Sequence, residues 1–217
     1  MSKVNINKQK KKNALMESAY ELFTTEGFIK TTIRDITHKA GVAKGTFYLY
    51  FKDKTDIREA VIKSTASQLL QEACNSLDEQ MKNSDVQMDV ADIFVYIIDY
   101  LVEVVAKDDL LVRFIAKHLS WGLFYTGSTT PGMNYPTSQS NSSDPDLDIE
   151  QYVINKLGEY NVRIKDLKLL LFTLLELVSS TCHDVILYQQ PVPLEEYKPY
   201  LNNCIRLLVN SAIEQTN

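Results

Sequence analysis

Residues 44–50 combine a cation, hydroxyls and a glycine at a spacing that suits contact with an anionic polymer. Lys44 supplies a positive charge, Thr46 and Tyr48 supply hydroxyls, and Gly45 has no side chain to keep a phosphate at a distance. Phosphate oxygens accept hydrogen bonds from such groups, and donors on a helix can also reach base edges in a major groove. These residue types therefore predict recognition of DNA.

Two short predicted helices, joined by a glycine turn, would position these side chains. Thr32 and Asp35 have the spacing of a capping box, which predicts the start of the first helix. Gly41 predicts its end, because glycine readily adopts the positive φ that a sharp turn requires. The expected inward anchors of the second helix are apolar: Val42, Phe47 and Phe51. This arrangement is a helix-turn-helix, whose second helix lies in the major groove.

The chain resembles the TetR family of bacterial transcription regulators over about residues 14–58. The segments that carry the resemblance, in order, are Phe23–Phe28, Thr32–Ile36, Ala40–Val42, Gly45–Tyr48 and Tyr50–Lys54. A helical hairpin within a larger all-α protein is the alternative. Ala43 departs from the family, which commonly has a small hydroxyl residue there, so one phosphate contact and the cap of the second helix are not expected.

The resemblance implies a homodimeric regulator, expected to be a repressor, that binds a pseudo-palindromic double-stranded DNA operator and senses a small apolar or amphipathic effector. The residues that the motif match assigns to DNA contact are Thr32, Lys44, Gly45, Thr46, Tyr48, Tyr50 and Lys54. Thr46 and Tyr48 are expected at base edges or sugars, and Thr32, Tyr50 and Lys54 at phosphates. The alternative is a regulator controlled by a protein partner, through residues 126–146, without a small-molecule effector.

Charge is divided unequally along the chain, whose formal net charge is −5. Residues 1–58 contain 12 Lys and Arg against 6 Asp and Glu, a net charge of +6. Residues 59–217 contain 11 against 22, a net charge of −11. The asymmetry predicts a basic DNA-binding domain at 1–58 and an acidic domain for effector binding and dimerisation at 59–217.

The hydrophobic pattern predicts an all-α fold, with an N-terminal three-helix headpiece and a helical body. Only 7 Gly and 6 Pro occur, and apolar residues recur at intervals of three and four. Outside the helix-turn-helix, the expected helices span about residues 9–26, 54–81, 88–106, 108–118, 147–160, 164–188 and 194–214. Residues 126–146 are rich in Gly, Ser, Thr, Pro, Asn and Asp, which predicts a long loop.

The last two predicted helices carry more apolar surface than one neighbouring helix can cover. Their apolar stripes comprise Leu167, Leu170, Leu171, Leu174, Leu177 and Val178, and then Tyr197, Leu201, Cys204, Ile205, Leu208 and Ala212. The family resemblance implies that these helices from two subunits form a four-helix bundle. Packing within one chain is the alternative. A two-fold dimer would match a pseudo-palindromic site.

The predicted body also gathers aromatic side chains beside a few polar groups, the composition of a small-molecule pocket. The candidate ligand contacts are Tyr96, Tyr100, Phe114, His118, Trp121, Phe124, Tyr125, Phe172 and His183. Ordinary core packing is the alternative for each of them. The family resemblance supports the set as a whole.

Other classes of function find little support in the sequence. The three histidines and three cysteines are widely spaced, so no metal, disulfide or cofactor is expected. Asp144, Asp146 and Asp148 imitate a calcium loop, but Ile149 stands where that loop needs glycine. Motifs of phosphate-binding or nucleophilic enzymes are absent, so no enzyme is expected. The apolar run 167–178 is shorter than the roughly 20 residues of a membrane span, and with no signal peptide evident the expected location is the cytoplasm.

Overall fold

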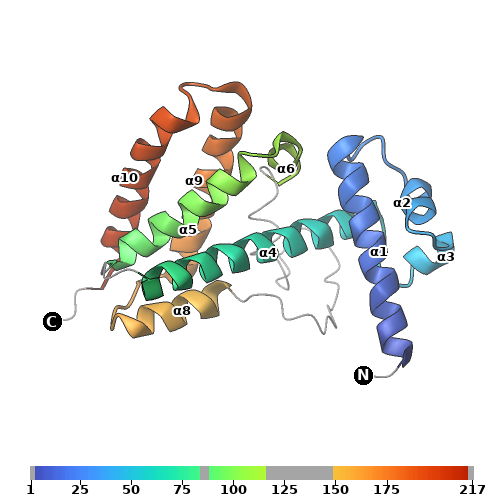
Figure 1. Cartoon of the computed structure of the whole chain (residues 1–217), viewed down its shortest axis with the longest axis horizontal. Helices are drawn as coiled ribbons and strands as arrows, with labels where there is room; N and C mark the ends of the chain where they lie inside the picture. Colours follow the sequence, from blue (N-terminus) through green and yellow to red (C-terminus); the bar gives the residue numbers. More distant parts are fainter. Residues whose placement is uncertain (1–2, 84–87, 116–148, 215–217) are drawn as a thin grey trace, which may run out of the picture.

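The structure is a computed structural model, and it describes residues 3–83, 88–115 and 149–214 (Figure 1). In these parts the chain is helical, with one isolated β-bridge between Ile164 and Ile213, which confirms the predicted all-α fold. The helices are α1 (Lys3–Thr25), α2 (Ile33–Lys39), α3 (Lys44–Phe47), α4 (Lys54–Asn83), α5 (Val90–Val105), α6 (Asp109–Ile115), α8 (Ile149–Glu159), α9 (Leu167–Tyr188) and α10 (Leu194–Ala212).

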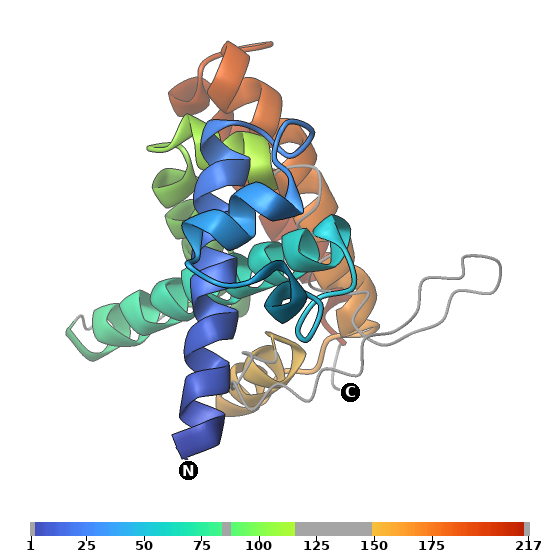
Figure 2. The ribbon, with the colours of Figure 1, turned by 90° about the vertical axis from the view of Figure 1, so that its right-hand side faces the viewer.

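The first three helices form a headpiece at one end of the molecule. Figure 2 faces the headpiece and shows α1 crossing α4, with α2 and α3 beside α1. Its core contains residues from each of these helices and from the start of α4: Leu15, Ile36, Phe47 and Ile57 are each 0% exposed. Burial of large apolar side chains on both sides of the turn holds α3 against α2, and α2 in turn packs against α1.

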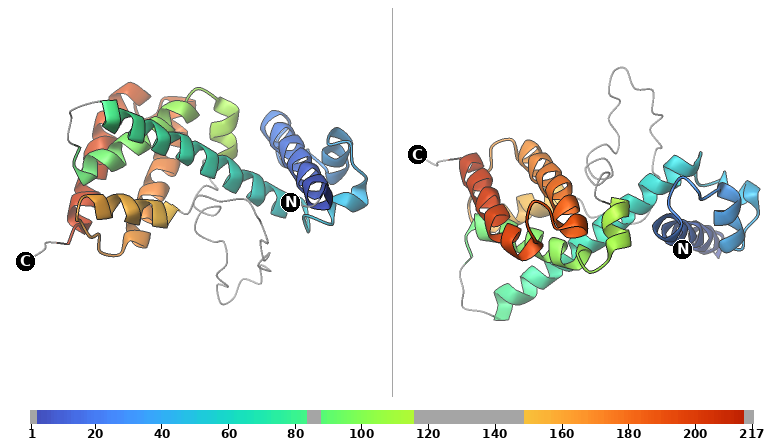
Figure 3. Two further views of the ribbon diagram at one scale, coloured as in Figure 1. Left: turned by 60° about the horizontal axis from the view of Figure 1, so that its bottom comes forward. Right: turned by 90° about the horizontal axis from the view of Figure 1, so that it is seen from above.

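Helix α4 connects the headpiece to the body, as the two views in Figure 3 show. Its start follows directly from the sequence, because Asp53 precedes it and its Oδ1 accepts from the backbone N–H groups of Thr55 (2.7 Å) and Asp56 (2.9 Å). The Asp56 carboxylate in turn accepts from the backbone N–H of Lys52 at 2.7 Å. These bonds satisfy N–H groups at the N-terminal end of a 30-residue helix. The turn that follows α3 is thus joined to the start of α4 by hydrogen bonds.

The body is built around α5, which packs against α4 on one side and α10 on the other. Asp89 and Asp92 form a capping box at its start. Its core residues Ala91 and Val102 meet Ile205 and Val209 of α10 in a second apolar cluster. Helix α9 packs against α10 and α6. By length and composition α9 could cross a membrane, with a mean hydropathy of 1.5 over 18 residues, 22% of which are buried.

Helices α9 and α10 are both shorter than the sequence predicts, for the same reason. Residues 163–165 run beside 212–214, where Lys165 N–H donates to the Ala212 carbonyl (2.8 Å) and Glu214 N–H donates to the Arg163 carbonyl (2.9 Å). This pairing satisfies backbone groups that a longer helix would otherwise use. Helix α9 therefore begins at Leu167 instead of 164, and α10 ends at Ala212 instead of 214.

Candidate functional site

The first helix of the motif starts at a complete capping box. The Thr32 hydroxyl accepts from the backbone N–H of Asp35 (3.2 Å), and Asp35 Oδ2 accepts from the backbone N–H (2.9 Å) and the hydroxyl (2.7 Å) of Thr32. The hydrogen bond from the Thr32 hydroxyl, and to a lesser extent the one from its backbone N–H, lower the pKa of the Asp35 carboxyl. The Thr32 hydroxyl, predicted to contact phosphate, is thus engaged in a cap in this structure.

The turn between α2 and α3 is a Schellman motif. Gly41 has φ +65°, a conformation that costs glycine little and other residues more. The backbone N–H of Val42 donates to Thr37 (3.0 Å) and that of Gly41 donates to His38 (3.2 Å), which is the bonding pattern of this helix end. The predicted stop at Gly41 is confirmed, and the turn directs α3 across the headpiece.

The second helix of the motif exposes one stripe and buries the opposite side. Phe47 (0% exposed) and Phe51 (4%) face the core, as predicted. Lys44, Gly45 and Tyr48 are exposed, with Tyr48 held edge-on against the Phe47 ring at 5.4 Å between centroids. The other predicted contacts on this segment, Thr46 and Tyr50, are half-buried. Ala43, the N-cap, makes no side-chain cap hydrogen bond, as its departure from the family pattern implies.

Lys54 lies at the base of this surface, but its ammonium is engaged inside the headpiece. Its Nζ donates to the carbonyls of Phe28 (2.6 Å) and Thr31 (2.8 Å) in the α1–α2 connection and lies 4.3 Å from the Phe28 ring centroid. The Arg58 guanidinium lies 4.3 Å from the same ring. Lys54 therefore orders the connection that precedes α2. No local pattern could predict this contact, because residues 28 and 54 are far apart in sequence.

A cavity of about 180 Å³ lies in the body between α4, α5, α6, α8 and α9. Its wall is almost entirely aliphatic, with Leu69 and Ile98 as examples, and its polar side chains, Ser179, Cys182 and His183, all belong to α9. Burial raises the pKa of the Cys182 thiol to about 11, so this group is neutral at physiological pH. In the described parts of the chain no group of three or more His, Cys, Asp or Glu residues could hold a metal ion.

The predicted ligand contacts are distributed unevenly relative to this cavity. His183 lines it, and its Nδ1 forms a 2.7 Å hydrogen bond with Asp184. Four predicted contacts lie outside the described residues: His118, Trp121, Phe124 and Tyr125. Among the residues that the structure describes, the cavity lining does not include the other four: Tyr96, Tyr100, Phe114 and Phe172. Sequence reasoning looked for aromatic residues and missed the aliphatic wall, because leucine and isoleucine also form any ordinary core.

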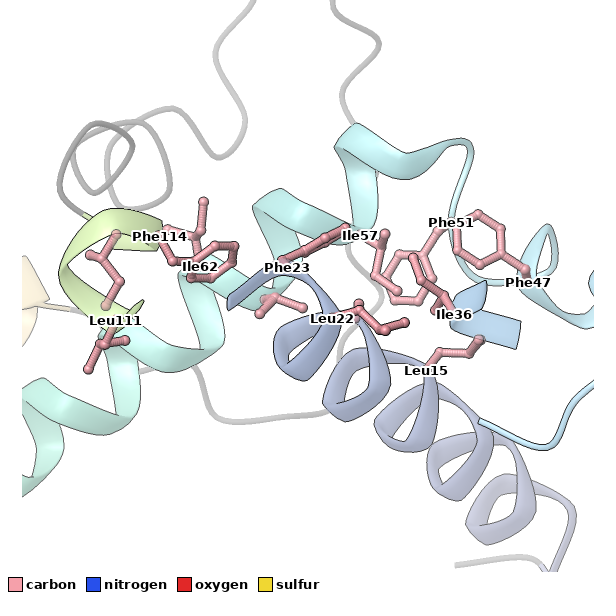
Figure 4. Packing of buried hydrophobic residues seen from close by; sticks show 13 residues of the cluster. Leu15, Leu22, Phe23, Ile36, Phe47, Phe51, Ile57, Ile62, Leu111 and Phe114 are labelled. Atoms are coloured by element: carbon pink, nitrogen blue, oxygen red, sulfur yellow. The ribbon is translucent and has the colours of Figure 1, made fainter. Parts of the chain in front are cut away.

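Helix α6 belongs to both the cavity and the headpiece core. Val112 and Ile115 line the cavity, whereas Leu111 and Phe114 join the apolar cluster of α1 and α4. Figure 4 shows Phe114 and Leu111 at the end of this cluster, with Phe23 between Phe114 and the centre of the headpiece. The Phe114 and Phe23 rings stack at 6.1 Å between centroids. A seven-residue helix thus lines the cavity and packs against α1 of the headpiece.

The apolar stripes expected at a subunit interface are mostly used within the chain. Their central residues Leu174 and Ile205 are 3% and 0% exposed in the body core. Other large apolar residues of α9 and α10 are exposed instead: Leu169 (63%), Tyr200 (67%) and Leu207 (72%). The free apolar face of these helices is therefore carried by residues that the predicted stripes did not include.

Comparison with known proteins identifies the headpiece. The family model described as "Bacterial regulatory proteins, tetR family" matches residues 15–61. The chain is 36% identical over 58 residues to the uncharacterized HTH-type transcriptional regulator YvdT of Bacillus subtilis, a match that covers 27% of this chain and 30% of YvdT. It is 32% identical over 73 residues to the fatty acid metabolism regulator protein of the same organism, covering 34% and 38%. The chain thus spans about a third of these curated relatives.

The similarity of fold extends over nearly the whole chain. A solved structure of Thermus thermophilus FadR, described as a TetR family transcriptional repressor in complex with lauroyl-CoA, superposes with a TM-score of 0.55. It is 22% identical and covers 90% of this chain and 93% of that chain. The relatives and this neighbour are transcriptional regulators, not enzymes. With the geometry of the helix-turn-helix, these matches show that residues 15–61 are a domain of the tetR family of bacterial regulatory proteins.

Proposed function

We propose that this protein is a ligand-responsive repressor that acts in the cytoplasm and binds a pseudo-palindromic operator as a homodimer. The observation that carries the proposal is the double role of α6, which lines the body cavity with Val112 and packs Phe114 into the headpiece core. A ligand in the cavity would therefore touch the same short helix that packs against α1 of the headpiece. We assign DNA binding to residues 1–58, and effector binding and dimerisation to 59–217.

For DNA contact we propose the exposed stripe of α3 and the turn after it. Lys44 would neutralise a phosphate, and Tyr48 would reach a base edge from a ring that Phe47 holds in place. Gly45 supports a close approach, because no atom of the described residues lies within 4 Å of where a Cβ would stand, and its φ is not positive. The fold of the free chain therefore does not require glycine here. Lys54 would act indirectly by holding the connection before α2.

For the effector we propose a small molecule with an apolar body and one polar end. The aliphatic wall suits the apolar part, while Ser179 and His183, one turn apart on α9, offer hydrogen-bonding groups at one side. The lauroyl-CoA complex of Thermus thermophilus FadR supports this class of effector, because a lauroyl chain is apolar and its thioester end is polar.

The switch that we propose is a displacement of α6. An effector that presses on Val112 and Ile115 would shift the helix, and Phe114 would move against Tyr20 and Phe23 of α1. Packed apolar contacts have few alternative arrangements, so a small shift favours a different headpiece position. The effector would thus lower the population of the DNA-competent dimer.

For the dimer we propose the exposed face of α9 and α10 that contains Leu169, Tyr200 and Leu207. Large apolar side chains exposed together on two neighbouring helices indicate an interaction surface. An isologous contact through this face would place two headpieces on one duplex.

The proposed function is tested by selecting bound sequences from a random DNA pool and measuring affinity for the selected site with and without lauroyl-CoA or dodecanoate. The expected site has two-fold symmetry. Linkage requires reciprocity: a tenfold loss of DNA affinity corresponds to a coupling of about 1.4 kcal/mol, and operator must weaken effector binding by the same factor. A probe that binds the protein but leaves operator affinity unchanged would show a cavity without a switch. A protein that selects no sequence at all would contradict the proposal.

A further inference from the structure

Leu49 is the most exposed large apolar residue of the segment 44–51, and its side chain has no hydrogen-bonding group. It is 78% exposed, more than its neighbour Tyr48 at 52%. Its backbone N–H donates to the Thr46 carbonyl at 3.2 Å, so it continues the helical turn of α3. Helix α3 ends at Phe47, so Leu49 lies in the turn that follows it.

The position of Leu49 is fixed by the residues behind it. Phe47 and Phe51 are buried in the headpiece core, and the backbone N–H of Phe51 donates to the Phe47 carbonyl at 3.0 Å. Leu49 lies between these two anchors on the opposite side. Its side chain therefore points to solvent from a segment that Phe47 and Phe51 anchor, and it contributes little to the packing of the headpiece core.

Gly45, on the same exposed segment, leaves free space where other residues have a side chain. An added Cβ at Gly45 would meet no atom of the described chain within 4 Å. Alanine would be a better helix former there than glycine, so the free protein gains nothing from the missing side chain. Gly45 and Leu49 thus both leave uncharged surface exposed on the segment that contains Lys44.

We propose that Leu49 contacts the C5-methyl group of a thymine in each half of the operator, with Gly45 allowing the close approach. This inference rests on the proposed DNA-binding function. Among the four unmodified base pairs, the thymine methyl is the apolar group that the major groove presents. A leucine side chain offers neither donor nor acceptor to the other base-edge groups. Leu49 is thus a specificity-determining residue that reads A·T against G·C at one position of each half-site.

The experiment uses the full chain and the site selected from a random DNA pool. Each thymine of that site is replaced in turn by deoxyuridine, which removes only the methyl group. Wild-type affinity is expected to fall about fourfold for one thymine per half-site, the factor that burial of one methyl-sized group gives. In Leu49→Ala the same replacement should change affinity by less than twofold, because the partner of the methyl is gone.

A matched control is Ile29→Ala. Ile29 is 90% exposed in the headpiece, but it precedes α2 in the chain and does not belong to the exposed stripe of α3. This variant loses the same kind of exposed aliphatic side chain and should keep the full sensitivity to the thymine methyl. The proposal is overturned if no thymine is methyl-sensitive, if Leu49→Ala keeps the sensitivity, or if Ile29→Ala also loses it. Failure of the wild type to select any sequence would instead refute the DNA-binding function itself.

Discussion

The ring of Phe114 meets the ring of Tyr20 edge-on across the junction between body and headpiece, with centroids 5.9 Å apart and planes at 86°. Aromatic pairs in this geometry are worth about 0.5–1.5 kcal/mol beyond their burial. Burial raises the pKa of the Tyr20 hydroxyl, and the nearby Asp108 carboxylate raises it further. Asp108 also caps α6, with Oδ1 accepting from the backbone N–H of Leu110 at 2.9 Å. The contact thus joins the last turn of α6 to the C-terminal part of α1.

Removing the Phe114 ring should weaken the coupling between effector binding and DNA binding. Phe114→Leu removes the ring but keeps an apolar side chain, so we expect effector binding within about twofold of wild type and a coupling free energy reduced by about 0.5–1.5 kcal/mol, the value of the ring pair. Titration of operator affinity against effector concentration measures this coupling. Phe172→Leu on α9 makes the same change outside the α6–α1 contact and should leave the coupling intact. Equal loss in both variants would contradict a route through Phe114.

Filling the cavity should block the effector without harming the fold. Ala66 is 5% exposed and lines the cavity from α4, so Ala66→Leu can place its added carbons in free space. We expect effector affinity to fall at least tenfold while operator affinity is kept. Ala73 on the same helix is 0% exposed and does not belong to the described lining, so Ala73→Leu should overpack the core and lower stability by about 1–3 kcal/mol. Urea unfolding and ligand titration of both variants separate the two effects.

The two lysines of the DNA-binding segment should respond differently to substitution. Lys44 is exposed, so Lys44→Ala should reduce the slope of log affinity against log salt by about 0.9 per subunit and leave stability unchanged. Lys54→Met removes donors from the carbonyls of Phe28 and Thr31, which should lower the free energy of unfolding by about 1–3 kcal/mol. Chemical denaturation and binding at several salt concentrations test this pair. A stable Lys54→Met protein with a flattened salt slope would restore Lys54 as a phosphate contact.

The headpiece could be predicted closely from the sequence, because local rules determine it. The capping box at Thr32, the glycine turn at 41 and the anchors Phe47 and Phe51 all lie within 20 residues of one another. The body could be predicted only as a set of helices. Which face of α9 is buried depends on α5, α6 and α10, and the side of the chain that remains free becomes visible only after these helices are packed.

The exposed face of α9 and α10 should respond to charge as a subunit interface would. Leu207→Glu places a carboxylate at a residue that is 72% exposed in the single chain, so the subunit should fold but dissociate, which sedimentation at micromolar concentration measures. Ile29→Glu, at a headpiece residue that is 90% exposed, should leave the dimer intact. Leu174→Glu buries an unpaired carboxylate in the body core and should unfold the chain instead. A dimeric Leu207→Glu protein would argue against this face.

The capping box predicts how the headpiece responds to acid. Hydrogen bonds from the Thr32 hydroxyl and backbone N–H lower the pKa of Asp35 below its ordinary value of 3.8, so the folded state binds this proton less readily than the unfolded state. The resulting stabilisation is present above the unfolded-state pKa and is lost as the pH falls through the lower, folded-state pKa. Asp35→Asn removes the carboxylate, so it should be less stable than wild type at neutral pH, and the difference should shrink below about pH 4. Thermal melts of both proteins between pH 2 and pH 7 test this. A difference that stays constant across that range would mean that the Asp35 carboxylate contributes no pH-dependent stability.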